Sequence, residues 1–189
     1  GGWERPATAR PTLPARVGAT TEPRIIVVDL PGAGQAAVTA AVRAPLRTDG
    51  AYYPMLVTNA IIGGGQNGHL FQEVRAKRGL SYGANSGISA RSEASVLVAS
   101  TQTKNESAAE VLGLVLFEFD RLKTEAVTET ATTDRETYIT GGFSSNLETT
   151  GGLGNFIAQT VQFGLPLSEL QNYPERVRAT TPEAIMAAA

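Results

Sequence analysis

The spacing of apolar residues changes several times along this chain, and the order of the changes constrains the fold. β-Branched runs and period-two alternation predict strands, whereas apolar residues at i, i+3, i+4 and i+7 predict helices. The predicted elements, in order, are strands at 24–30 and 35–43, helices at 49–63 and 70–77, strands at 82–90 and 94–101, and helices at 108–122, 128–146, 149–163, 167–178 and 181–189. This order favours an α+β layer over an alternating parallel sheet.

Local signals mark where these elements begin, end and turn. The first two strands flank a Pro-Gly turn, which predicts a hairpin or two neighbouring strands. Asp49 is the expected N-cap of the first helix, and a glycine within 63–65 is expected to adopt the left-handed conformation after its last turn. Thr181 is an expected N-cap followed by proline at the first helical position. Simple alternation places Tyr82 on the same strand face as Ala84.

The composition of residues 1–23 differs from that of the rest of the chain. This stretch contains four prolines and few apolar residues, which predicts an extended interdomain linker before a folded domain at 24–189. Residues 1–189 do not begin with a charged-then-apolar stretch, and no apolar run among them approaches the roughly 18 residues of a membrane span. The last predicted helix stops after about two turns, so we expect the chain to end inside the domain.

The chain has one histidine and no cysteine among its 189 residues. Zinc sites are built mainly from these two residue types, so an ordinary zinc site within this chain is not expected. Disulfides, iron–sulfur clusters and cysteine nucleophiles are excluded because the sequence has no thiol. The formal net charge is −2, from 16 basic and 18 acidic residues, and lacks the basic footprint of a nucleic-acid binder.

The unusual features gather between residues 59 and 86, where three ligand-binding motifs can be compared. The glycine segment lacks the Lys-Ser/Thr pair of a phosphate-binding loop. It follows a helix rather than the strand that a dinucleotide-binding fingerprint requires. His69 and Glu73 have the i, i+4 spacing of metal ligands, but no second histidine completes a site, which favours a solvent-facing or hydrogen-bonded His69.

Three other features of this segment have simple structural interpretations. Arg75 is placed as a helix C-terminal cation that interacts with the macrodipole. Tyr82 would be an ordinary strand aromatic, and the glycines would form a helix cap and turn. These interpretations remain open beside the functional one below.

The segments Asn59 to Gly65, Leu70 to Arg75 and Lys77 to Tyr82, in this order and spacing, resemble the second-domain signature of the M16 metallopeptidases. This family includes pitrilysin, insulinase and the mitochondrial processing peptidase. The resemblance covers nearly the whole chain. It implies an M16 peptidase domain, a LuxS/MPP-like metallohydrolase fold with a mostly antiparallel sheet and helices packed on one face.

In that family two related domains, in one chain or in two subunits, enclose an unfolded peptide. One carries an inverted His-x-x-Glu-His zinc site, and the other contributes an Arg and a Tyr seven residues apart. The resemblance implies that Arg75 and Tyr82 act on the peptide bond held at the zinc of the other half. It also implies that Gly63, Gly64 and Gly65 lie along the substrate. His69 matches no family role.

Two hypotheses follow from the resemblance. In the first, this chain is the non-zinc-binding half of a zinc endopeptidase and is inactive alone. It is expected to have no metal ligands or cofactor of its own. Zinc is expected in the partner domain or, in a heterodimer, in the partner subunit. The alternative is a non-catalytic scaffold or peptide-binding subunit of the same fold. We expect the chain to end before the last strand of its domain, and analogy with bacterial relatives suggests a periplasmic or exported location.

Overall fold

The computed structural model describes residue 2 and residues 22–189. The chain divides into two compact units, residues 1–31 and 32–189, and every assigned helix and strand lies in the second. Most of the predicted linker lies outside the described residues. The strand predicted at 24–30 is not formed: these residues have no regular secondary structure, and the side chains from Ile25 to Val28 are at least 70% exposed. Without assigned partner strands, β-branched propensity is not enough to form a ladder.

The remaining elements follow the order that the sequence predicts. The strands are β1 (Ala36–Ala44), β2 (Ser81–Ala90) and β3 (Ser95–Thr103). The helices are α1 (Tyr52–Gly63), the π-helix η1 (Phe71–Ala76), the short 3-10 helix η2 (Asn105–Ser107), α2 (Ala108–Thr124), α3 (Glu129–Leu147), α4 (Thr150–Gln162), α5 (Glu169–Arg178) and α6 (Pro182–Ala188).

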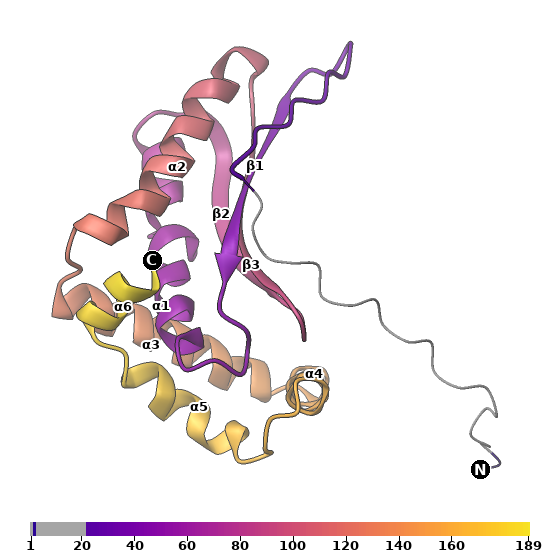
Figure 1. Cartoon of the computed structure of the whole chain (residues 1–189), viewed down its shortest axis with the longest axis vertical. Helices are drawn as coiled ribbons and strands as arrows, with labels where there is room; N and C mark the ends of the chain where they lie inside the picture. The colour runs from indigo at the N-terminus through magenta and orange to yellow at the C-terminus, as the bar shows by residue number, and fades with distance from the viewer. Residues whose placement is uncertain (1, 3–21) are drawn as a thin grey trace. The chain divides into compact units, whose positions relative to one another are not determined.

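The three strands form one antiparallel sheet in the order β1-β3-β2. Alternate residues of β3, including Leu97 and Ala99, are buried beneath helices, with Val38 of β1 and Ala84 of β2 on the same face. Helices α1 and α2 pack against this face (Figure 1). The fold is therefore α+β with helices on one face of an antiparallel sheet, as the resemblance to the M16 family implies.

Of the two helix N-caps that the sequence predicts, Thr181 is confirmed and Asp49 is not. Thr181 accepts a hydrogen bond from the backbone N–H of Ala184, as predicted, and Thr128 and Thr149 cap α3 and α4 in the same way. Asp49 is not the N-cap of α1, because that helix begins after Ala51. The Asp49 carboxylate instead accepts from the backbone N–H of Leu46, 2.8 Å away, and stabilises the preceding turn.

The end of α1 packs on the middle of β2 with no room for a side chain. A Cβ built on Gly63 would lie 2.2 Å from the backbone nitrogen of Ser86 and 2.3 Å from its Oγ. Ser86 itself donates to Oδ1 of Asn59 at 2.7 Å, one turn earlier on the helix. Gly63 thus permits the close approach that fixes α1 on β2.

A buried ion pair joins α1 and α5 through the loop before α1. The Glu169 side chain is fully buried, and its Oε1 lies 2.7 Å from Nη2 of Arg47 and also accepts from the Tyr53 hydroxyl. Arg176 lies 3.1 Å from the other carboxylate oxygen. The Arg47 guanidinium stacks 4.3 Å from the centre of the Tyr52 ring, so its charge is enclosed by aromatic and acidic groups.

Arg47→Met should destabilise the domain by about 3–5 kcal/mol, because it leaves the Glu169 carboxylate buried without its nearest cation. Arg47→Met combined with Glu169→Leu should recover much of this loss. The matched control is Lys123→Ala, which breaks an exposed pair with Asp120 and should cost under about 1 kcal/mol. Urea denaturation measures all three. Equal losses for Arg47→Met and Lys123→Ala would contradict the importance of the buried pair.

Gly63→Ala should cost about 1–3 kcal/mol, because its methyl group would force α1 away from β2. The control is Gly113→Ala in α2, where an added Cβ meets nothing within 4 Å. That change should instead stabilise by roughly 0.5–1 kcal/mol through helix propensity. The free energy of unfolding of both variants separates a steric effect from a general effect of alanine, and a stabilised Gly63→Ala variant would exclude the close packing.

Candidate functional site

The glycine segment predicted to end the first helix does so in two steps. Gly64 is the C-cap and its N–H donates to the carbonyl of Ala60 at 3.1 Å, while Gly65 has φ +67°. The left-handed glycine is therefore present, at Gly65. Gly63 is buried against β2, whereas Gly65 is exposed. The backbone that solvent can reach thus begins beyond Gly63.

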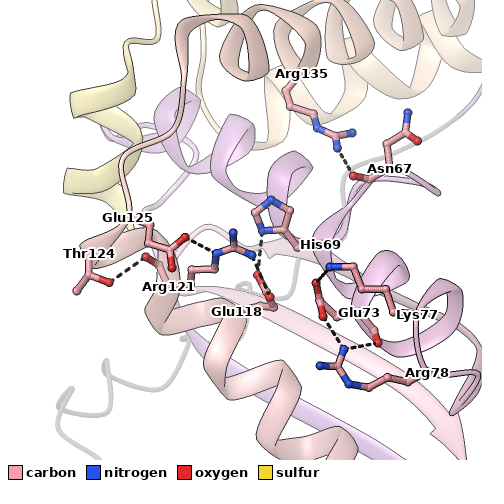
Figure 2. Close-up of polar contacts among 10 residues, drawn as sticks. All are labelled: Asn67, His69, Glu73, Lys77, Arg78, Glu118, Arg121, Thr124, Glu125 and Arg135. Atoms are coloured by element: carbon pink, nitrogen blue, oxygen red, sulfur yellow. Dashed lines mark hydrogen bonds and ion pairs between the residues drawn. The ribbon is translucent and has the colours of Figure 1, made fainter.

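A side chain of helix α3 binds backbone carbonyls of the glycine loop. Nη1 of Arg135 donates to the carbonyl of Gly64 at 3.3 Å, and Nη2 donates to the carbonyl of Asn67 (Figure 2). Burial lowers the pKa of Arg135. A cavity of about 420 Å³ lies beside this contact and is lined by Asn67, Tyr138 and other residues of α3. No sequence signal marks Arg135, because an isolated arginine on a helix shows no spacing that reveals its partner.

Arg75 lies in a π-helix rather than the predicted α-helix. The N–H of Lys77 donates to the carbonyl of Gln72, five residues back, at 2.9 Å. Each such turn contains an extra residue, and single π turns are frequent at functional sites. The helix ends at Ala76, one residue before the predicted end at 77, and Gly79, with φ +63°, turns the chain toward β2.

Tyr82 points to solvent and not to the core. From Ser81 to Ala84, β2 advances by three residues, whereas its partner β3 moves by only two, from Thr103 to Thr101. β2 therefore has one extra residue here, which forms a β-bulge. The bulge shifts the alternation, and the Tyr82 side chain is 88% exposed while Ala84 is buried. The prediction that Tyr82 and Ala84 share a face is therefore wrong. A glycine inside a strand, here Gly83, is the one sequence signal of such a bulge.

The π-helix and the bulge bring Arg75 and Tyr82 together. The centre of the Arg75 guanidinium lies 4.3 Å from the centre of the Tyr82 ring and 5.5 Å from that of Phe71. Nη1 of Arg75 also donates to the backbone carbonyl of Tyr82. In the described part of the chain, the Tyr82 phenol has no hydrogen-bond partner. The site therefore presents a free phenol beside a cation with N–H groups to spare.

The acidic and basic groups near this site pair with each other. The Glu73 carboxylate lies 2.5 Å from both Nζ of Lys77 and Nη1 of Arg78. The hydrogen bond from Lys77, and to a smaller extent that from Arg78, lowers the pKa of Glu73. His69 turns elsewhere, with Nδ1 2.9 Å from the buried carboxylate of Glu118 on α2 (Figure 2). His69 is thus the hydrogen-bonded residue that the sequence favoured, and it does not share a ligand site with Glu73.

Residues 22–189 contain no cluster of three His, Cys, Asp or Glu side chains able to hold a metal ion. Within the same residues, no helix is both long enough and apolar enough to cross a membrane. The chemistry that the site offers is hydrogen-bond donation, by a phenol and a guanidinium side by side, to an oxygen that carries or gains negative charge.

Known proteins are similar to this chain in sequence and in fold. The sequence pattern of the peptidase M16 inactive domain matches residues 1–133. An uncharacterised zinc protease of Streptomyces coelicolor is 29% identical over 173 residues, which cover 92% of this chain and 35% of that protein. This chain therefore spans about a third of that relative.

Solved structures agree with this match. The peptidase M16 inactive domain from Pseudomonas fluorescens superposes with a TM-score of 0.74 at 27% identity, over 82% of this chain and 37% of that one. The inactive peptidase domain of a Bordetella parapertussis protein has a TM-score of 0.73 at 13% identity, over 85% of this chain and 88% of that one, which shows a shared fold. The chain belongs to the M16 peptidase family, as the family's inactive domain.

Proposed function

We propose that this chain is the substrate-binding and transition-state-stabilising half of an M16 zinc endopeptidase. The observation that carries the proposal is the pairing of Arg75 with the exposed Tyr82, which a π-helix and a β-bulge bring together. Two local irregularities that meet at a half-buried Arg75 and an exposed Tyr82 are difficult to explain as packing alone, because neither side chain is part of the core.

The pair suits the chemistry of peptide hydrolysis. When water attacks a peptide carbonyl, its oxygen gains negative charge, and preorganised donors stabilise that charge in the transition state. Tyr82 offers an unpartnered O–H, and Arg75 is held in place by the Tyr82 carbonyl while its other N–H groups remain able to donate. The exposed glycine backbone around Gly65 would lie beside the extended peptide and form part of one chamber wall.

The zinc would come from another domain or subunit. The described residues of this chain do not form a metal site, and a similar protein is a zinc protease of nearly three times the aligned length. We therefore propose a partner that bears the inverted His-x-x-Glu-His motif, in the same polypeptide or as a separate subunit. The substrate would be an unfolded peptide, and this half alone would be inactive.

Arg75→Ala and Tyr82→Phe should each lower the turnover of an unstructured peptide by roughly 100-fold to 1000-fold, because each removes a donor to the developing charge. The assay uses the protein in which this domain is combined with the zinc-bearing half, and zinc content should stay unchanged. Arg91→Ala is the matched control: Arg91 is exposed and directly follows the far end of β2, so the change should leave turnover intact.

Near-wild-type turnover in both variants would refute the catalytic assignment. Wild-type peptide affinity with no cleavage, in every combination with a zinc-bearing half, would instead support the alternative of a non-catalytic peptide-binding subunit.

A further inference from the structure

The bulge that exposes Tyr82 is closed by two side-chain hydroxyls. Oγ of Ser81 and Oγ1 of Thr101 lie 2.7 Å apart, across the β2–β3 ladder. Oγ1 of Thr101 is 2.7 Å from the carbonyl oxygen of Gly83, and the N–H of Gly83 donates to Oγ of Ser81 at 3.2 Å. Thr101 is 8% exposed, so these bonds form away from bulk solvent.

These contacts form a ring in which every group is satisfied. A hydroxyl has one proton and donates only once. With Thr101 donating to the carbonyl of Gly83, Ser81 donating to Thr101, and the N–H of Gly83 donating to Ser81, each hydroxyl donates once and accepts once. Oγ of Ser81 also lies 2.9 Å from the carbonyl oxygen of Gly83, which is an alternative acceptor if the Ser81 hydroxyl rotates.

The ring provides hydrogen-bond partners for backbone groups at the bulge. A bulge leaves backbone groups without their ladder partners, and a half-buried N–H or carbonyl without a partner is costly. The ring satisfies both backbone polar groups of Gly83, the residue directly after Tyr82. Before the bulge, Thr103 donates to the carbonyl of Leu80 at 2.6 Å and holds the entry to β2.

We propose that Ser81 and Thr101 are positioning residues for Tyr82: their hydroxyls hold the bulge in the one backbone conformation that places the phenol beside Arg75. The inference rests on the proposed role of Tyr82. Without the ring, β2 would gain by returning to regular pairing, and alternation would turn Tyr82 toward the core face. Because Arg75 donates to the Tyr82 carbonyl, the same shift would also release the guanidinium.

The test is Thr101→Val in the protein that combines this domain with the zinc-bearing half. Valine keeps the shape and strand propensity of threonine but removes the hydroxyl. We expect kcat to fall by about 10-fold to 100-fold with KM unchanged, since a displacement of about 1 Å is enough for such a loss. Thr101→Ser, which keeps the hydroxyl, should restore most of kcat. The control is Thr39→Val on the exposed face of β1, which should leave both constants unchanged.

A double-mutant cycle distinguishes positioning from a general structural effect. If Thr101 acts through Tyr82, Thr101→Val should cause a smaller loss in a Tyr82→Phe background than in the wild type, because only its effect on Arg75 then remains. Equal losses in the two backgrounds, or unchanged kcat in Thr101→Val while Tyr82→Phe is impaired, would overturn the inference and leave the proposed function intact. An unimpaired Tyr82→Phe would overturn this inference, and it would overturn the proposed function as well if Arg75→Ala were also unimpaired. If Thr101→Val does not fold, Ser81→Ala breaks the same ring, and the same outcomes apply to it.

Discussion

The close contact between the end of α1 and the middle of β2 determines the geometry of the candidate site. Because Gly63 has no side chain, the helix lies directly on the backbone of Ser86. Residues 64–80, which connect α1 to β2, must leave the helix and return to the start of the strand. The glycine loop, the π-helix and the turn at Gly79 make this return, and they bring Arg75 back over the first residues of the strand.

Two departures from regular structure then complete the site. In a regular strand Tyr82 would share the buried face of Ala84, and its phenol would be lost to the core. The bulge places an extra residue in β2 and sends the ring to solvent, where the guanidinium of Arg75 stacks on it. The structure stabilises this irregularity with hydroxyls of Ser81 and Thr101, which replace the ladder bonds that the bulge breaks.

The helical layer has a different kind of constraint. The carboxylate of Glu169 is withdrawn from water and depends on Arg47, Arg176 and the Tyr53 hydroxyl. Nearby, burial raises the pKa of Tyr173, whose ring stacks 4.4 Å from that of Phe143 on α3. These contacts join α1, α3 and α5 far from Arg75 in sequence. Helix α3 in turn reaches the glycine loop through Arg135, so the helical layer also supports the site.

The sequence by itself determined the elements whose signals are local. Helical spacing, threonine caps and glycines with left-handed backbone depend on neighbouring residues, and the positions of the helices and of β1 to β3 along the chain follow from such local patterns. The order of the strands within the sheet does not follow from them. The ordered motifs around Arg75 and Tyr82 likewise identified the family. The strand predicted at 24–30 failed because a strand needs a partner that local propensity cannot supply.

Only the tertiary structure decided which way Tyr82 faces, where Asp49 bonds and which helix holds the glycine loop. The direction of Tyr82 and the position of the glycine loop depend on groups distant in sequence: Thr101 across the sheet for the bulge, and Arg135 on α3 for the loop. Asp49 bonds to a nearby residue, the N–H of Leu46, but its residue type suits a helix cap as well as a turn, and the structure shows the turn. Sequence periodicity assumes regular geometry, and the candidate site lies where long-range hydrogen bonds make the geometry irregular.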